Sequence, residues 1–151
     1  MKTDIVPFWK RLALEEMTHR QWESLCDGCG RCCLRKLEFE DTGEIVYTNV
    51  ACALLDITRC RCTAYDDRAV KNPECLVLHA GSLKQSLHLL PDTCAYRLIA
   101  QGEDLPWWHH LVCGDQDMVH EAHISVREKV VSEDYVQEEE LEDHIIDWVI
   151  I

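Results

Sequence analysis

A run of four cysteines within eight residues constrains this chain most strongly: Cys26-Asp27-Gly28-Cys29-Gly30-Arg31-Cys32-Cys33. Two residues between consecutive cysteines allow their thiolates to turn toward one centre, as in zinc knuckles and in the first three ligands of bacterial iron–sulfur clusters. Gly28 and Gly30 can adopt positive φ, so the loop can fold tightly and donate backbone N–H groups to sulfur. The spacing therefore predicts a metal site. Because the neighbouring side chains of Cys32 and Cys33 usually diverge, at least one ligand is expected from elsewhere.

Further along the chain, four cysteines between residues 52 and 75 are candidates for the remaining ligands. One residue separates Cys60 from Cys62, so both thiols can point to the same side of an extended segment. A site closed in this way joins residues 26–33 to residues 52–75. Cys94 and Cys113 lie outside this spacing, and we expect a small core residue and a bystander there. The predicted metal ligands are Cys26, Cys29, Cys32, Cys33, Cys52, Cys60, Cys62 and Cys75.

The composition describes one folded domain with many thiols. The chain has 151 residues, of which 47% are hydrophobic and 28% charged, and 10 are cysteines. Its net charge of −13 argues against binding to duplex nucleic acid or to an anionic membrane surface. Residues 1–14 lack the apolar core of a signal peptide, and no stretch approaches the roughly 20 apolar residues of a membrane span. We therefore expect a cytoplasmic protein, and in that reducing compartment dense cysteines serve as metal ligands or redox groups rather than as disulfides.

Hydrophobic spacing predicts the elements around this site. Apolar residues at helical spacing indicate an amphipathic helix over residues 7–25 that leads into the first cysteine. Alternation over residues 36–50, interrupted by Asp41-Thr42-Gly43, indicates a β-hairpin. The expected fold class is α+β: a small single domain with an N-terminal helix, a β-hairpin and short helices around a cysteine-rich metal site. We also expect irregular chain over 51–75 and 103–117, short helices over 83–90 and from Asp92 or Thr93 to Gly102, and one or two strands within 123–135.

The end of the chain differs in charge from the rest. Residues 133–151 contain eight acidic residues and no Lys or Arg, so this segment carries −8 of the net charge of −13. We divide the chain accordingly into a cysteine-rich metal-binding domain, residues 1–132, and an acidic C-terminal tail or helix, residues 133–151. A solvated helix or a partly ordered tail explains such a charge run, and the alternative is a docking segment for a basic protein partner.

The cysteine pattern and its surroundings resemble a known family. The chain reads Cys26-x-x-Cys29-Gly-x-Cys32-Cys33, then Cys52-Ala-Leu-Leu, then Cys60-Arg-Cys62-Thr-Ala-Tyr65-Asp-Asp-Arg68, then Pro73-Glu-Cys75, and later Leu90-Pro-Asp-Thr-Cys94 and Leu105-Pro-Trp-Trp-His109. These stretches resemble the YkgJ-like CxxCxxCC family of zinc- or iron-chelating proteins and are most similar to its YcgN subgroup. The resemblance spans most of the chain. It implies metal or iron–sulfur binding by the motif cysteines and implies no particular reaction.

The sequence leaves the reaction open. It contains no phosphate-binding loop, dinucleotide fingerprint or nucleophile elbow, so catalytic residues, a small-molecule substrate and enzyme status stay unassigned. His109 and His110 can add a nitrogen ligand, but we expect them to pack and hydrogen-bond locally. The surplus of cysteines beyond one four-thiolate set favours an iron–sulfur cluster over zinc, although two zinc ions sharing eight cysteines also fit. Three classes remain: a redox or metal-dependent enzyme component, a zinc-stapled structural or protein-interaction module, and a metal delivery or sensing protein.

Overall fold

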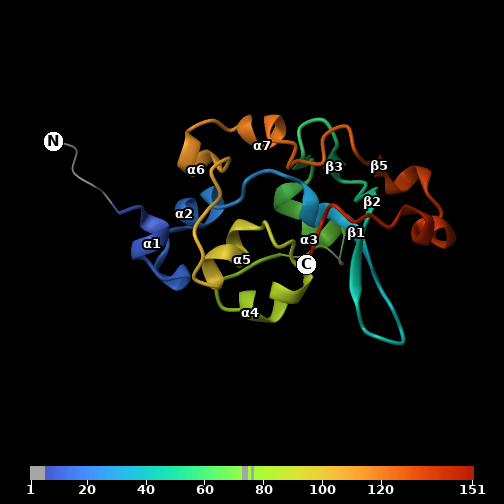
Figure 1. Cartoon of the computed structure of the whole chain (residues 1–151), viewed down its shortest axis with the longest axis horizontal. Helices are drawn as coiled ribbons and strands as arrows, with labels where there is room; N and C mark the ends of the chain where they lie inside the picture. The colour runs from blue at the N-terminus through green and yellow to red at the C-terminus, as the bar shows by residue number, and fades with distance from the viewer. Residues whose placement is uncertain (1–5, 73–74, 76) are drawn as a thin grey trace.

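The chain forms many short helices around a small sheet. The computed structural model describes residues 6–72, 75 and 77–151, and it has the expected α+β fold class (Figure 1). Helices this short gain little from helix propensity, so burial of their apolar side chains holds them in place. The α-helices are α1 (Phe8–Arg11), α2 (His19–Ser24), α3 (Arg68–Lys71), α4 (Leu83–Ser86), α5 (Ala95–Ala100), α6 (His110–Cys113) and α7 (Met118–Glu121). Turns of 3₁₀ helix lie at Leu14–Glu16, Arg31–Cys33, Tyr65–Asp67, Leu87–Leu89, Glu133–Tyr135 and Glu138–His144.

The predicted hairpin forms the centre of the main sheet. β1 (Leu34–Glu38) pairs antiparallel with β2 (Ile45–Ala51), and β2 pairs in parallel with β5 (Val131–Ser132). Gly43 makes the turn with a φ of +70°. The hairpin prediction is confirmed, and the hairpin tip projects from the body of the molecule in Figure 1. A second, two-stranded sheet joins β3 (Leu55–Asp56) to β4 (Arg61–Cys62).

The N-terminal segment forms three short helical pieces in place of the expected continuous helix over residues 7–25. α1 is followed by a 3₁₀ turn and then by α2. Thr18 starts α2: its hydroxyl accepts the Gln21 N–H (3.1 Å), and Gln21 Oε1 accepts the Thr18 N–H (2.9 Å). Such a reciprocal cap marks a helix start. The chain therefore begins a new helix at Thr18, and α2 delivers the fully buried Leu25 to the beginning of the cysteine motif.

The later elements are shorter than expected. The two predicted helices that follow the cysteine region appear as α4 with its 3₁₀ turn and as α5, and the expected loop over 103–117 contains α6. Within residues 123–135, Val131–Ser132 is the strand that forms. His123 and Glu128 have φ of +62° and +63°, and positive φ at such residues interrupts an extended chain.

The C-terminal segment packs onto the sheet. Val149 is buried in the same apolar cluster as Tyr47, and the Ile146 N–H donates to the Tyr47 carbonyl (3.0 Å). The Asp92 N–H donates to the Ile150 carbonyl (2.7 Å). The acidic segment is thus anchored through its apolar residues, while most of its carboxylates stay at the surface.

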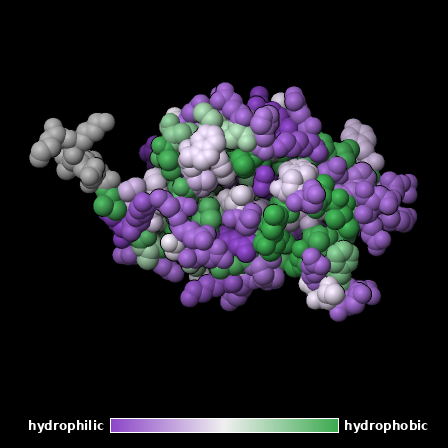
Figure 2. Space-filling view, viewed as in Figure 1, coloured by the Kyte–Doolittle hydropathy of each residue, from purple (hydrophilic) through white to green (hydrophobic). Residues whose placement is uncertain are grey.

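The surface in view is mainly hydrophilic. Figure 2 shows apolar surface gathered where the hairpin meets the C-terminal segment, and Ile150, 59% exposed, belongs to this part of the chain. Among the helices that the structure describes, none combines the length and the apolar character needed to span a bilayer.

Candidate metal centre

The loop that carries the cysteine motif has a tight shape. Gly28 and Gly30 have φ of +76° and +77°, as their place in the motif predicted. The Arg31 N–H donates to Cys29 Sγ (3.4 Å), and the Val126 N–H donates to the Cys29 carbonyl (2.9 Å). The backbone therefore fixes Cys29 and directs an N–H group at its sulfur, and this hydrogen bond partly offsets the rise in the pKa of Cys29 that burial causes.

Two histidines hold carbonyl groups at the start of this loop. His109 is fully buried, and its Nδ1 accepts the Leu111 N–H (3.0 Å), so its Nε2 carries the proton and donates to the Leu25 carbonyl (2.7 Å). His110 Nε2 lies 3.2 Å from the Cys26 carbonyl, and the two imidazole rings stack with centroids 4.6 Å apart. Burial lowers the pKa of His109 and keeps it neutral. With both ring nitrogens engaged, His109 supports the loop by local hydrogen bonding, as expected, and has no nitrogen free for a metal.

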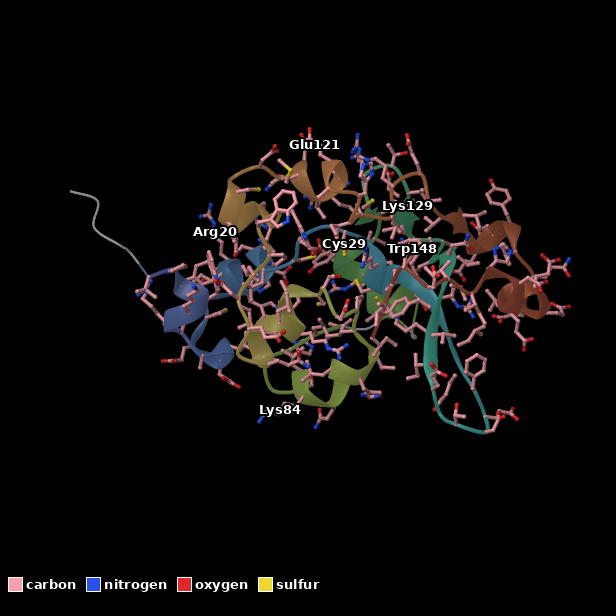
Figure 3. The ribbon with its side chains drawn as sticks, in the orientation of Figure 1. Arg20, Cys29, Lys84, Glu121, Lys129 and Trp148 are labelled. Carbon is pink, nitrogen blue, oxygen red and sulfur yellow. The ribbon has the colours of Figure 1, made fainter. Side chains whose placement is uncertain are left out.

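Arg31 ties the motif loop, residues 26–33, to three distant segments. The residue is only 6% exposed; its Nε donates to the Ile124 carbonyl (2.7 Å), and its Nη1 lies 3.5 Å from Thr93 Oγ1. Its guanidinium lies over the Trp148 ring at 5.6 Å, and Lys129 Nζ lies 5.1 Å from the centroid of that ring. Figure 3 shows the labelled Lys129 and Trp148 close to each other. The start of α5 and the C-terminal segment are thus placed against the motif loop, far from it in sequence.

One set of thiols shares the neighbourhood of Asp27. Asp27 Oδ1 accepts the Cys29 N–H (2.9 Å), whereas Oδ2 is buried without a hydrogen-bond partner in the part of the chain that the structure describes. Desolvation by surrounding protein, the Asp27 carboxylate and the Cys32 thiolate raise the pKa of Cys29, and also that of Cys26. Desolvation, Cys32 and Asp27 likewise raise the pKa of Cys94 to about 12. The Cys32 charge thus acts on Cys26, Cys29 and Cys94.

A second set of thiols gathers around Cys33 at the base of the hairpin. The Cys52 N–H donates to the Cys33 carbonyl (2.8 Å). Asn72 Nδ2 donates to Cys52 Sγ (3.3 Å), and the Asn72 carbonyl accepts the Cys75 N–H (3.0 Å). Cys62 comes from β4, where it pairs with Leu55 three residues after Cys52. Backbone and side-chain hydrogen bonds thus connect the hairpin base to Asn72 and, through Asn72, to Cys75.

The adjacent residues Cys32 and Cys33 connect the two sets. The Cys33 thiol donates a hydrogen bond to the Cys32 sulfur, which lowers the pKa of Cys32 to about 7. That hydrogen bond, the Cys32 charge and burial raise the pKa of Cys33, and the charges of Cys75 and Cys52 add to the rise. Burial raises the pKa of Cys75, and the charges of Cys32, Cys52 and Cys62 add to the rise, so Cys32 acts on thiols of both sets.

Cys60 and Cys113 lie apart from these sets. Cys60 is 4% exposed within the apolar cluster around β2, with a φ of +58° and its sulfur 3.6 Å from the Ile57 carbonyl. Burial raises the pKa of Cys60, and the other main influences on it come from residues 125–127, not from a cysteine. Cys113 is exposed, with its sulfur 3.6 Å from the Trp108 carbonyl.

The structure thus divides the predicted ligands differently from the sequence. Seven of the eight predicted cysteines lie in the two sets, while the eighth, Cys60, lies in the core. Cys94, expected to be a core residue, does pack against an apolar cluster, but it also borders the motif loop through the Arg31–Thr93 contact. The sequence placed Cys94 early in a helix capped by Asp92 or Thr93, whereas α5 begins at Ala95, directly after Cys94. Nothing local in the sequence indicated which loop this helix start would meet.

The donor set fits a thiophilic metal. None of the ten cysteines, all of which lie among the described residues, is joined in a disulfide. Within residues 6–72, 75 and 77–151, no three His, Cys, Asp or Glu side chains are arranged to hold a metal ion. The two sets are therefore neighbourhoods of thiols and not closed coordination shells. Soft sulfur ligands select zinc or iron–sulfur clusters.

Comparison with known proteins agrees with this chemistry. Residues 25–95 match the CxxCxxCC family, described as "Putative zinc- or iron-chelating domain". The chain is 54% identical over 145 residues to a UPF0260 protein of Marinobacter nauticus, covering 96% of this chain and 97% of the relative. It is 50% identical over 146 residues to a UPF0260 protein of Pseudomonas putida, covering 97% of both chains.

The chain belongs to the UPF0260 family. The resemblance noted in the cysteine pattern is thereby confirmed, and the family match supports metal binding by this UPF0260 protein. The matched region of the UPF0260 protein contains nine of its ten cysteines and leaves out Cys113. No solved structure matches the chain.

Proposed function

We propose that this UPF0260 protein carries a metal centre held by thiolates of the cysteine motif, and that an iron–sulfur cluster is favoured over zinc. The observation that supports this most is the motif loop itself, in which Cys29 Sγ accepts the Arg31 N–H and the neighbouring Asp27 Oδ2 is buried with no hydrogen-bond partner among the described residues. Four thiolates satisfy one zinc ion, and the number of thiols in the two sets exceeds that need. A CxxCxxC run also supplies the first three ligands of bacterial clusters.

The surrounding residues suit a highly anionic centre. The Arg31 N–H points at Cys29 Sγ, and Lys36 Nζ lies 3.2 Å from the Cys32 carbonyl, so positive charge and N–H dipoles flank the motif. Such groups offset the charge of several thiolates and set the potential of a bound cluster. When bound, an iron–sulfur cluster supplies one-electron transfer, whereas a closed zinc site supplies structural cross-links.

Anaerobic purification followed by elemental analysis tests the proposal. Iron with matching acid-labile sulfide and a visible absorption that bleaches on reduction is the expected result. Cys29→Ser should lose metal, because Cys29 is the buried thiol of the motif, and the matched control Cys113→Ser should keep the wild-type metal content. Wild-type protein without iron or zinc would overturn the proposal, and equal metal loss in both variants would show that the centre lies elsewhere.

A zinc-stapled interaction module is the second candidate. It is supported by the small amount of regular structure around the thiols, since the strands β3, β4 and β5 each have two residues. Metal ligation can replace core packing in such regions. Zinc without sulfide would favour this candidate, and the acidic segment 133–151 would then be the first surface to probe with a basic protein partner.

A further inference from the structure

We infer that the outer edge of β2 is a docking surface for an extended, cationic segment of another protein, which adds to the main sheet as a strand beside residues 43–47. This surface is separate from the cysteine motif. All ten cysteines are among the described residues, and none of them lines the groove that follows this edge. Docking here therefore goes beyond the proposed function and does not depend on which metal the protein binds.

The register of the main sheet turns backbone groups of β2 away from β1. Tyr47 pairs with Lys36 of β1, yet the Tyr47 carbonyl accepts the N–H of Ile146 on the other side of the strand (3.0 Å). In an antiparallel pair, residues two apart along a strand direct their N–H and C=O groups to the same side. The N–H and C=O groups of Ile45 therefore also point away from β1, toward the outer edge.

Within the described chain, the segments that pair with this edge reach only its second half. β5 pairs with Val50 and Ala51, and Ile145 forms an antiparallel bridge with Thr48. The first half, residues 43–47, borders an open groove of about 460 Å³. The hairpin projects from the body of the molecule at this end (Figure 1). An open strand edge of this kind is a template for pairing with another extended chain.

The lining of the groove combines apolar side chains with two exposed carboxylates. Ile146, Val149 and Ile150 line its other wall, and the apolar surface in Figure 2 gathers at this place. Glu44 and Asp147 are the exposed acidic residues of the lining, which contains no Lys or Arg. No salt bridge between described residues involves either carboxylate. A strand that alternates apolar and cationic side chains matches this lining, because successive side chains of a strand point to opposite faces.

Charge distinguishes a cationic partner from a second copy of this chain. The hairpin tip beside the groove carries four exposed acidic residues, Glu38, Glu40, Asp41 and Glu44. Pairing between the β2 edges of two copies would bring these carboxylates together, and like charges on paired strands are destabilising. Charged side chains on natural edge strands prevent pairing between copies in this way. The same carboxylates attract a cationic segment, so charge complementarity selects that partner.

Fluorescence anisotropy with labelled peptides tests the docking surface in the wild-type full-length protein. The probe is a short peptide of alternating lysine and valine, and the control peptide has the same composition with its lysines and valines in two separate blocks. The alternating peptide should bind about tenfold more tightly, because only it can direct its valines to one face of an added strand. Equal affinity for the two peptides would show attraction by net charge alone and would overturn the inference.

Two variants test whether the peptide binds at this edge. Ile45→Pro removes an N–H that faces away from β1, so the hairpin keeps its own hydrogen bonds while an added strand loses a partner. Its affinity for the alternating peptide should fall about tenfold, with a native circular dichroism spectrum. Asp147→Lys reverses a charge in the groove and should weaken binding about threefold. The matched control Glu121→Lys, also at an exposed residue but on α7 (Figure 3), should bind like wild type.

Wild-type affinity in a folded Ile45→Pro variant overturns the inference, and so does equal weakening by Asp147→Lys and Glu121→Lys. If Ile45→Pro does not fold, the comparison of the two charge reversals decides the matter, because both change exposed side chains. Sedimentation of wild type and Ile45→Pro at the same concentrations tests the second copy as the occupant. The two should have the same oligomeric state. A wild-type dimer that Ile45→Pro dissociates would assign this edge to a second copy and would overturn the inference.

Discussion

Alanine substitutions at Gly28 and Gly30 separate two contributions to the loss of stability: the cost of positive φ and the cost of a steric clash. Gly30 and Gly28 have nearly the same φ, +77° and +76°, but a Cβ at Gly30 would meet Val126 Cγ2 at 2.9 Å, whereas a Cβ at Gly28 has no neighbour within 4 Å. A left-handed residue with a Cβ costs about 1–2 kcal/mol. Overpacking of a close contact adds about 1–3 kcal/mol. We therefore expect Gly28→Ala to lose about 1–2 kcal/mol and Gly30→Ala about 2–5 kcal/mol.

The assay is urea and thermal unfolding of both variants, purified in the same way and compared at matched metal content. For a chain of this length 1 kcal/mol corresponds to roughly 2–4 °C in Tm. Gly30→Ala should melt well below Gly28→Ala, and the difference reports the close approach of the motif loop to Val126. Equal destabilisation of the two variants would refute the reasoning, because the backbone cost is shared and only the packing cost differs.

Two further variants test the contacts that hold the site. Val149→Ala should destabilise the fold by about 2 kcal/mol, since it removes buried methyl groups from the cluster at the sheet. The control Ile150→Ala, at a residue that is 59% exposed, should change the urea midpoint little. Similar small effects at both positions would show that the C-terminal segment is not anchored. For His109, burial lowers the pKa, so below about pH 6.5 the unfolded state takes up a proton that the folded state resists, and stability should fall as pH drops. His109→Gln keeps an N–H donor for the Leu25 carbonyl without titrating. Unfolding curves between pH 7 and 5 should show that the free energy of unfolding depends less steeply on pH in the variant. An unchanged pH dependence would contradict the assignment of this effect to His109.

Several elements could be predicted because their signals are local. The hairpin was visible from alternating side chains and the turn at Gly43, and the positive φ of Gly28 and Gly30 followed from their place between cysteines. The break in the N-terminal helix was also encoded locally, by the Thr18 and Gln21 cap, but the helical spacing of apolar residues obscured it. Spacing reports which face is buried and not where a helix starts anew.

The later strands were harder to predict for a different reason. The β-branched residues between 123 and 135 favour extended chain, yet positive φ at His123 and Glu128 limits the strand to Val131–Ser132. Which residues pair with β2 depends on the whole sheet, because a strand is stable only where it can pair with the free edge of another strand. Local propensity carries no information about that edge.

The sequence by itself determined that this protein has a thiol-rich loop suited to metal, because two-residue spacing and glycine turns act within one short segment. Tertiary structure decided which distant segments lie against it. Arg31 reaches Thr93 and so places Cys94 at the loop, while packing against Val126 and Gly30 holds Cys60 in the core. Cysteine spacing cannot distinguish these outcomes, since the direction of each thiol depends on backbone dihedrals and on contacts between segments far apart in the chain.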